Sequence, residues 1–149
     1  MNSKPIDWNI QGFDAYLVNC LGIVFNPKTK KILIGRREND PLIKELTWVF
    51  PGGQTMAHQR LEEHLKQDLK NRTNLDVEVK QLIHSRIMPE HQRIMNLYYF
   101  AEVKKIGNEK AGKNLKELKW IKPSEFKKHA TTSIDEKVEK FLKQLEKKR

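Results

Sequence analysis

The chain has 149 residues, with 29 Lys and Arg against 19 Asp and Glu, so its formal net charge is +10. This length suits one domain, residues 1–149, that is large enough to bury a hydrophobic core. Its apolar stretches fall far short of the roughly 20 residues that span a bilayer, and Met1–Asp14 lacks the apolar core of a signal peptide. The one cysteine, Cys20, excludes an internal disulfide framework and a multi-cysteine zinc site. We therefore expect a cytoplasmic protein without a membrane anchor, whose positive charge suits a phosphate-rich partner.

The first 53 residues predict a β-hairpin followed by a short strand. Ala15–Phe25 and Lys31–Arg36 are rich in β-branched and aromatic residues, and the Asn-Pro start of Asn26–Thr29 is typical of a tight turn. A charged loop separates this hairpin from the short strand Thr47–Phe50, which we expect to end at Pro51-Gly-Gly53.

An amphipathic helix is predicted next. Leu61, Leu65 and Leu69 recur at i, i+4 and i+8 and form one apolar stripe. Residues with high helix propensity continue to Arg72, and Asn74 is a suitable C-terminal stop.

The second half predicts more strands and a C-terminal helix. Val77–Ile87, Ile94–Val103 and Leu115–Lys122 have the composition of strands. Ser133 and Glu136 have the spacing of a capping box, and the helix after them has an apolar face formed by Val138, Phe141, Leu142 and Leu145. The order strands, helix, strands, helix predicts an α+β fold of the α/β/α sandwich type.

The strand that ends in Pro51-Gly-Gly53, with a helix soon after it, is the most informative segment. Glycines allow unusual backbone angles and close approach of a ligand, and a helix N-terminus offers free N–H groups to phosphate. Gly52 and Gly53 are therefore candidate substrate-binding residues.

Several segments together resemble the Nudix hydrolase family over most of the chain: Leu33-Ile-Gly-Arg-Arg37, Trp48-Val-Phe-Pro-Gly-Gly53, the following helix, and Trp120-Ile121. The resemblance implies a mixed β-sheet packed between helices. It also implies hydrolysis of nucleoside diphosphates linked to another group, with Mg²⁺ or Mn²⁺ as cofactor.

The Nudix box of this family is degenerate in the present sequence. Aligned from Gly53, the box keeps its spacing and its aliphatic positions Leu69 and Leu75. Its four acidic positions fall on Gln59, Asp68, Asn71 and Arg72, so one carboxylate remains; Gln67 replaces the Arg and Asn74 the terminal Gly. Mg²⁺ prefers carboxylate oxygens, and Arg72 places a positive charge where the ion is bound in the family. We therefore expect hydrolysis to be weakened or lost.

Two alternatives keep a metal or a catalytic base. Asp68 and His64 are one helical turn apart and share a face with Asn71, so the first two form a candidate metal site. Glu90 lies in a predicted loop, and in several Nudix subfamilies the general base comes from a loop outside the box. Asp68 and Glu90 are therefore the candidate catalytic residues.

A third interpretation replaces the metal with protein cations. Arg72, with Arg36 or Arg37, would bind a diphosphate directly, because guanidinium groups match phosphate oxygens. Gln59 and Asn71 join these arginines as candidate substrate-binding residues.

The sequence thus leaves three functions open. The first is a nucleotide- or diphosphate-binding protein with little or no pyrophosphohydrolase activity, and the second is a divergent metal-dependent hydrolase. The third is a basic RNA-binding or regulatory module that uses the Lys-rich loop Lys104–Asn114 and the tail Lys147–Arg149.

Overall fold

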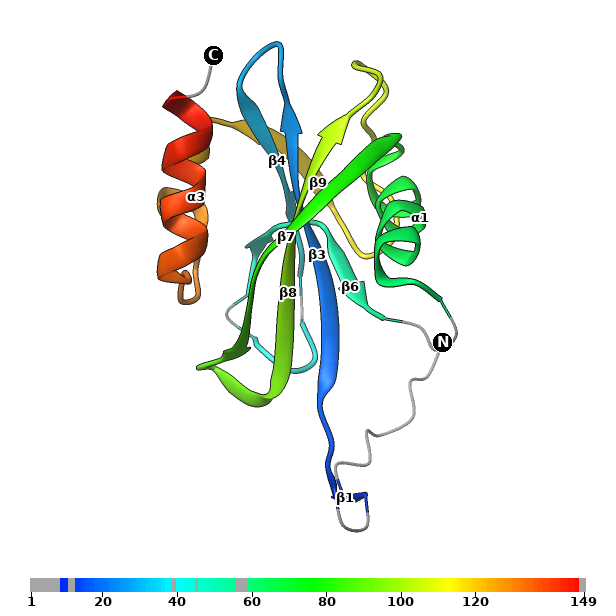
Figure 1. Ribbon diagram of the computed structural model, residues 1–149, viewed down its shortest axis with the longest axis vertical. Coiled ribbons are helices and arrows are strands. Elements are labelled where there is room, and N and C mark those ends of the chain that lie inside the picture. Colours follow the sequence, from blue (N-terminus) through cyan, green and yellow to red (C-terminus); the bar gives the residue numbers. More distant parts are fainter. Residues whose placement is uncertain (1–8, 11–12, 39, 45, 56–58, 148–149) are drawn as a thin grey trace.

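A seven-stranded mixed sheet forms the centre of the molecule in the computed structural model, which describes residues 9–10, 13–38, 40–44, 46–55 and 59–147. Its main path runs in the order β5-β4-β3-β8-β7, while β6 pairs with β3 and β9 pairs with β4. The strands are β3 (Leu17–Asn26), β4 (Lys31–Arg36), β5 (Trp48–Val49), β6 (Gly52–Gln54), β7 (Val77–Met88), β8 (His91–Val103) and β9 (Glu117–Ile121). A separate pair of short strands, β1 (Asn9–Ile10) and β2 (Phe13–Asp14), lies beyond the start of β3 (Figure 1).

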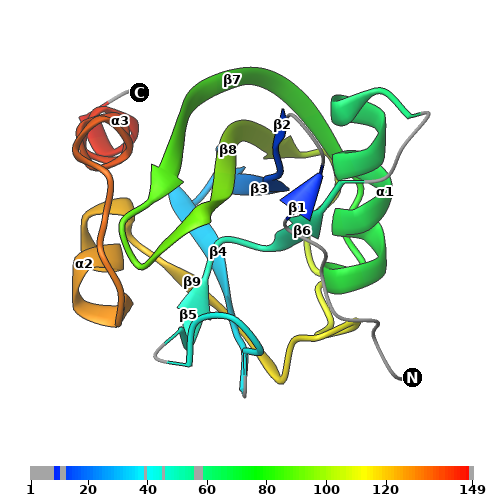
Figure 2. The same ribbon diagram turned by 90° about the horizontal axis from the view of Figure 1, so that it is seen from below.

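Helices cover both sides of this sheet. α1 (Leu61–Thr73) lies on one side, and α3 (Glu136–Lys147) lies on the other with the short helices η1 (Pro123–Glu125) and α2 (Phe126–His129) (Figures 1 and 2). The predicted α/β/α sandwich, with a mixed sheet between helices, is confirmed.

Two hydrophobic clusters hold the layers together. The side chains of β3 point alternately to the two faces of the sheet, so this strand supplies residues to both clusters. Ile23 and Phe25 belong to the cluster under α3, while Cys20 and Val24 belong to the cluster under α1. Successive side chains of a strand point to opposite faces, so one apolar strand supplies both cores. Full burial of an aliphatic side chain contributes about 1.5–3 kcal/mol, which is why the apolar run Cys20–Phe25 suits this central position.

The local predictions agree well with the structure. β3 and β4 form the predicted antiparallel hairpin, with Val24 opposite Leu33. α1 ends where expected, because Asn74 adopts the left-handed conformation (φ 63°) and its N–H donates to the carbonyl of Lys70 at 2.9 Å. An amide side chain tolerates this conformation better than most residues do.

One local prediction is wrong and one strand was not predicted. β5 ends before Pro51-Gly-Gly53 as expected, but Gly52 and Gly53 then begin a further strand, β6, which pairs antiparallel with β3. The residue that caps α3 is Asp135 and not Ser133: Asp135 Oδ2 accepts hydrogen bonds from the backbone N–H groups of Lys137 and Val138 at 2.9 and 3.1 Å. Ser133 lies outside the helix because its N–H and hydroxyl both donate to the Glu90 carboxylate.

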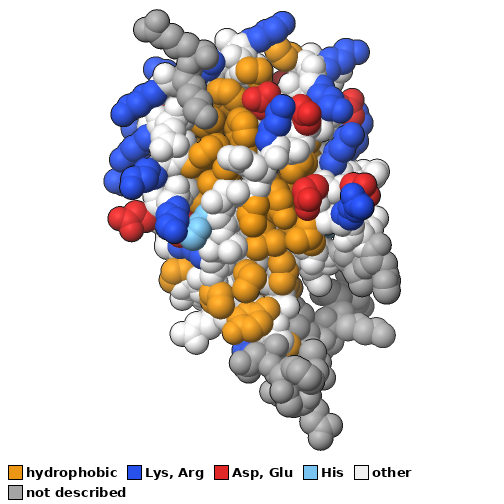
Figure 3. All heavy atoms as spheres, viewed as in Figure 1, with side chains coloured by type: hydrophobic (Ala, Val, Ile, Leu, Met, Phe, Trp, Pro, Cys, Tyr) orange, Lys and Arg blue, Asp and Glu red, His pale blue; other side chains and the backbone are white. Residues whose placement is uncertain are grey.

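The surface combines apolar and basic regions. Hydrophobic side chains run through the middle of the face seen in Figure 3, and Lys and Arg side chains surround them at the margins. The large hydrophobic side chains most exposed among the described residues are Tyr16, Leu82, Ile87 and Ile106. None of the helices in the described part of the chain combines the length and apolar character that crossing a membrane requires.

Candidate ligand-binding cavity

A cavity of about 530 Å³ opens between the start of β3, the β6 strand, α1 and the residues 37, 40–43 and 46 that follow β4. Its volume is within the range typical of small-molecule sites, about 300–1,000 Å³. Among the residues that the structure describes, five charged side chains line it: Arg37, Asp40, Asp68, Arg72 and Lys113. Three of these are cations and two are carboxylates, so these side chains together carry a charge of 3 − 2 = +1.

The Asp68–Arg72 ion pair forms the α1 side of the cavity. Arg72 Nε donates to Asp68 Oδ2 at 2.9 Å, and the two side chains are only 7% and 8% exposed. The pair spans one helical turn, the spacing at which opposite charges meet on a helix surface. Asp68 therefore balances a buried guanidinium.

Gly53 provides the space into which Arg72 extends. A Cβ atom at Gly53 would lie 2.5 Å from Arg72 Nη2, so only glycine leaves room for the guanidinium in this position. Gly52 has a different role: its φ is 139°, and a Cβ there would lie 2.1 Å from the carbonyl oxygen of Cys20 on β3. The absence of a side chain at Gly53 thus makes room for the Arg72 guanidinium, and its absence at Gly52 makes room for the β3 backbone.

Arg37 and Arg36 differ in position although they are adjacent. Arg37 lines the cavity and pairs with Asp40 through Nη2 and Oδ2 at 3.1 Å. Burial lowers the pKa of Arg37, the Asp40 carboxylate opposes this effect, and the positive charge of Arg72 adds to it. Arg36 is not among the lining residues; its guanidinium pairs with Glu38 at 2.6 Å and Glu117 at 3.0 Å.

His64 lines the cavity but both of its ring nitrogens have partners. Nδ1 lies 2.9 Å from Gln59 Oε1, and Nε2 lies 3.0 Å from the backbone oxygen of Gln54. A metal at His64 would require one of these contacts to break. The structure thus places Gln59 against His64 at the start of α1.

The donor groups at the cavity do not fit the divalent-metal site that the Nudix resemblance implies. Mg²⁺ is held by carboxylates together with water and phosphate, whereas Asp68 and Asp40 both accept from arginines. Within the described residues, no three His, Cys, Asp or Glu side chains lie together in a way that could hold a metal ion.

Asn71 and Glu90 lie outside this cavity. Asn71 is exposed on α1, and its backbone oxygen accepts a hydrogen bond from the N–H of Lys113 at 3.3 Å. Glu90 follows β7 in a turn, where it binds Ser133 in the segment before α3. Burial raises the pKa of Glu90, but the hydrogen bonds from Ser133 and from its own backbone N–H, together with the charge of Arg86, lower it overall.

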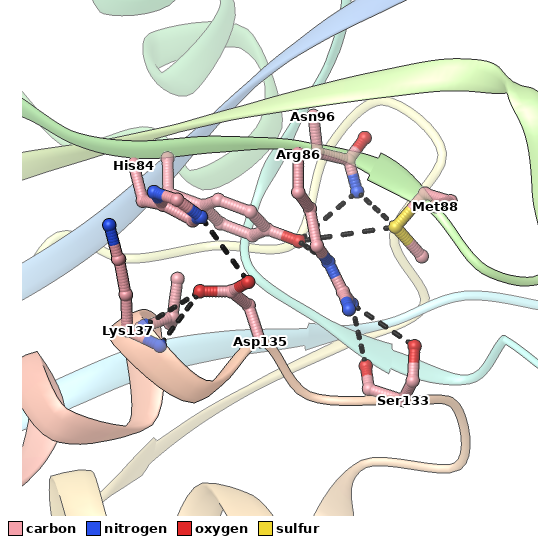
Figure 4. A network of polar contacts seen from close by, with 9 residues as sticks. His84, Arg86, Met88, Asn96, Ser133, Asp135 and Lys137 are labelled. Atoms are coloured by element: carbon pink, nitrogen blue, oxygen red, sulfur yellow. Dashed lines mark hydrogen bonds and ion pairs between the residues drawn. The ribbon is translucent and has the colours of Figure 1, made fainter.

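Sequence reasoning missed Asn19 and Asn96, which face each other on the cavity wall. They are direct partners in the parallel pairing of β3 with β8, and Asn19 Nδ2 donates to Asn96 Oδ1 at 3.2 Å. Asn96 also contacts Met88, and Tyr98 links it to Arg86 and through Arg86 to Ser133 (Figure 4). The signal available in the sequence was an asparagine within each of the apolar runs that form β3 and β8.

Solved structures of Nudix proteins are similar to the chain in fold. A MutT protein from Methanosarcina mazei Go1 is 16% identical to the chain, with 89% of this chain and 94% of that one covered and a TM-score of 0.67. A NUDIX hydrolase from Nitrosomonas europaea is also 16% identical, with coverage of 89% and 73% and a TM-score of 0.71. An ADP-ribose pyrophosphatase from Streptococcus suis 89-1591 is 16% identical, with coverage of 87% and 87% and a TM-score of 0.57.

Comparison with protein-family models gives no match, and comparison with curated protein sequences gives none either. The structural matches cover most of the chain. The chain therefore has the fold of the Nudix hydrolases.

Proposed function

We propose that this protein binds a diphosphate-containing nucleotide derivative in the cavity without a divalent cation, and that its pyrophosphohydrolase activity is weakened or lost. The observation that carries the proposal is the position of Arg72. Its guanidinium lies in the cavity wall against Gly53, and it is held there by the buried Asp68 carboxylate.

Protein cations supply the charge that a diphosphate requires. Arg37 and Arg72 lie close enough for the charge of Arg72 to lower the pKa of Arg37. An anion bound between the two guanidinium groups would relieve this repulsion, and guanidinium hydrogen bonds to phosphate are strong and directional. Lys113 adds a third cation at the cavity and forms no ion pair with any of the described residues.

The same groups argue against efficient hydrolysis. Cleavage in the family depends on metal ions that neutralise phosphate charge and activate a water molecule. The cavity offers two carboxylates, and each is paired with an arginine. The structurally similar ADP-ribose pyrophosphatase from Streptococcus suis suggests ADP-ribose as a test ligand.

Isothermal titration calorimetry in EDTA tests the proposal, with inorganic pyrophosphate, ADP and ADP-ribose as ligands. We expect at least one of them to bind in EDTA, with an affinity that excess Mg²⁺ does not raise. Lys113→Gln should weaken binding about 10- to 150-fold, because a hydrogen bond to a charged group contributes about 1.5–3 kcal/mol.

Lys116→Gln is the matched control, since Lys116 is exposed in the same segment and does not line the cavity. Its affinity should equal that of the unmodified protein. The proposal is wrong if none of the three ligands binds in EDTA. Rapid hydrolysis of ADP-ribose to AMP and ribose 5-phosphate with Mg²⁺ or Mn²⁺, abolished by Asp68→Ala, would instead support the hydrolase alternative.

A further inference from the structure

The cavity has two chemically different groups of lining side chains. The charged group comes from α1 and from Arg37, Asp40 and Lys113. The other group is apolar and includes Ile43, Met88 and Ile94, which pack together as a buried cluster. The proposed diphosphate uses the first group only, so the apolar group is available to an uncharged part of the ligand.

Asn19 and Asn96 bring amide groups to the β-sheet wall of this cavity. The flanking partners in the parallel β3–β8 pair are apolar or aromatic: Leu17 with Ile94, and Leu21 with Tyr98. Alternation along both strands points these three pairs to one face of the sheet. Two asparagines in an otherwise hydrophobic wall need hydrogen-bond partners, because an unpaired buried amide is costly.

The orientation of Asn96 is fixed by its surroundings. Its side chain is buried, and its Nδ2 donates to Met88 Sδ at 2.9 Å and to the Tyr98 hydroxyl at 3.4 Å (Figure 4). Its Oδ1 is therefore left to accept the hydrogen bond from Asn19 Nδ2 at 3.2 Å. Asn96 thus determines which way the amide of Asn19 points.

Asn19 is left with an acceptor that the protein does not use. It is half-buried and lines the cavity, and no described residue donates a hydrogen bond to its Oδ1. An amide oxygen has two lone pairs and can accept from a water molecule or a ligand N–H. A fixed acceptor at the edge of an apolar surface suits a flat ring that carries N–H groups.

We propose that Asn19 is a specificity-determining residue that accepts a hydrogen bond from an N–H of a nucleobase. The base lies against the apolar group of the cavity, while the diphosphate lies at Arg37, Arg72 and Lys113. This inference rests on the proposed function, because it assigns the uncharged part of the same ligand. Asn96 is the positioning residue that holds the Asn19 amide in the orientation for this contact.

Calorimetry with two kinds of probe tests this assignment: inorganic pyrophosphate, which has no base, and the diphosphates of adenosine, guanosine, cytidine and uridine. At least one nucleoside diphosphate should bind tenfold or more tightly than pyrophosphate. Asn19→Leu should remove this advantage and leave the affinity for pyrophosphate unchanged. Asn96→Leu should reduce the differences among the four nucleosides and likewise spare pyrophosphate, which a general loss of structure would not do.

Asn108→Leu is the matched control, because Asn108 is exposed and does not line the cavity. It should bind all five probes as the unmodified protein does. If Asn19→Leu retains the preference for the nucleoside, or weakens pyrophosphate equally, the role of Asn19 is wrong while the proposed function stands. If neither pyrophosphate nor any nucleotide binds the unmodified protein, the proposed function itself fails and this inference with it.

Discussion

At the scale of single residues, position 72 has the largest consequences for the cavity. Arg72 is 5% exposed as a whole residue and takes its counter-charge from Asp68, one helical turn earlier. Burying two charges is costly, and the attraction between them repays this cost only while both are present. The pair is therefore a vulnerable point of the core as well as part of the proposed anion site.

Removing one partner of this pair should destabilise the protein strongly. Arg72→Met leaves the Asp68 carboxylate buried without its cation, which costs about 3–5 kcal/mol. The double variant Asp68→Leu/Arg72→Met should recover most of this loss, because no buried charge remains. Urea denaturation at pH 7 measures both free energies of unfolding.

The exposed pair Lys70–Asp76, on the same helix and the turn after it, serves as the control. Its atoms are 3.5 Å apart and its side chains are 44% and 57% exposed, so Asp76→Asn should cost less than about 1 kcal/mol. If Arg72→Met were equally mild, the Asp68 and Arg72 charges would not be buried together as described.

At the scale of elements, residues just before the first turn of α3 form polar contacts that hold this helix against the β7–β8 hairpin. Glu90 accepts from the N–H and the hydroxyl of Ser133, and Arg86 Nη2 donates to the carbonyl oxygen of Ser133 at 2.9 Å. Asp135 caps the helix itself and lies 3.3 Å from His84 Nε2 (Figure 4). These contacts hold the helix over the cluster that contains Val138 and Leu142.

The Glu90–Ser133 contact should make stability depend on pH. The pKa of Glu90 is lowered from its ordinary value of 4.5, so its contribution is present above that pH and is lost as the pH falls below it. Glu90→Gln should remove this part of the acid sensitivity, by about 1 kcal/mol or less because water screens the exposed carboxylate. Urea denaturation of both proteins between pH 7 and pH 3 measures the difference.

Glu63→Gln is a suitable comparison, since Glu63 is exposed on α1 and distant in sequence from the α3 contacts. It should keep the pH dependence of the unmodified protein. An identical pH dependence in Glu90→Gln would mean that the Ser133 contact does not distinguish the folded from the unfolded state.

At the scale of the whole molecule, the sandwich encloses its one thiol. Cys20 lies on β3 in the cluster beneath α1 and is 1% exposed. Burial, with smaller effects from the charges of Glu62 and Asp68, raises the pKa of this thiol from 9.0 to about 11. Access to Cys20 therefore requires the α1 layer to separate from the sheet.

Thiol labelling at pH 8 should report this separation. A rise of two pH units in the pKa lowers the thiolate fraction about 100-fold, and burial slows the reagent further. We expect the folded protein to react at least about 100-fold more slowly than protein unfolded in urea. Rapid labelling without denaturant would show that α1 opens independently of global unfolding.

Much of the fold followed from local patterns along the chain. The Asn-Pro turn, the Leu61, Leu65 and Leu69 stripe and the stop at Asn74 each act within a few residues, so they can be read without knowing the partner elements. The capping box failed because Ser133 is bound by Glu90, 43 positions away. Ser133 thus bonds to a residue that is distant in the sequence instead of capping the helix that follows it.

The sequence by itself predicted the order of the longer strands and of helices α1 and α3, and it suggested a Nudix-like spacing after Gly53 with a single box carboxylate. Only the tertiary structure decided that Arg72 extends over Gly53 into the cavity, that Arg36 and Glu90 lie elsewhere, and that Asn19 faces Asn96. The reason is that periodicity fixes which residues share a face of one element. Which faces meet depends on strand pairing between segments 77 residues apart, and that pairing is set by the packing of the whole sheet.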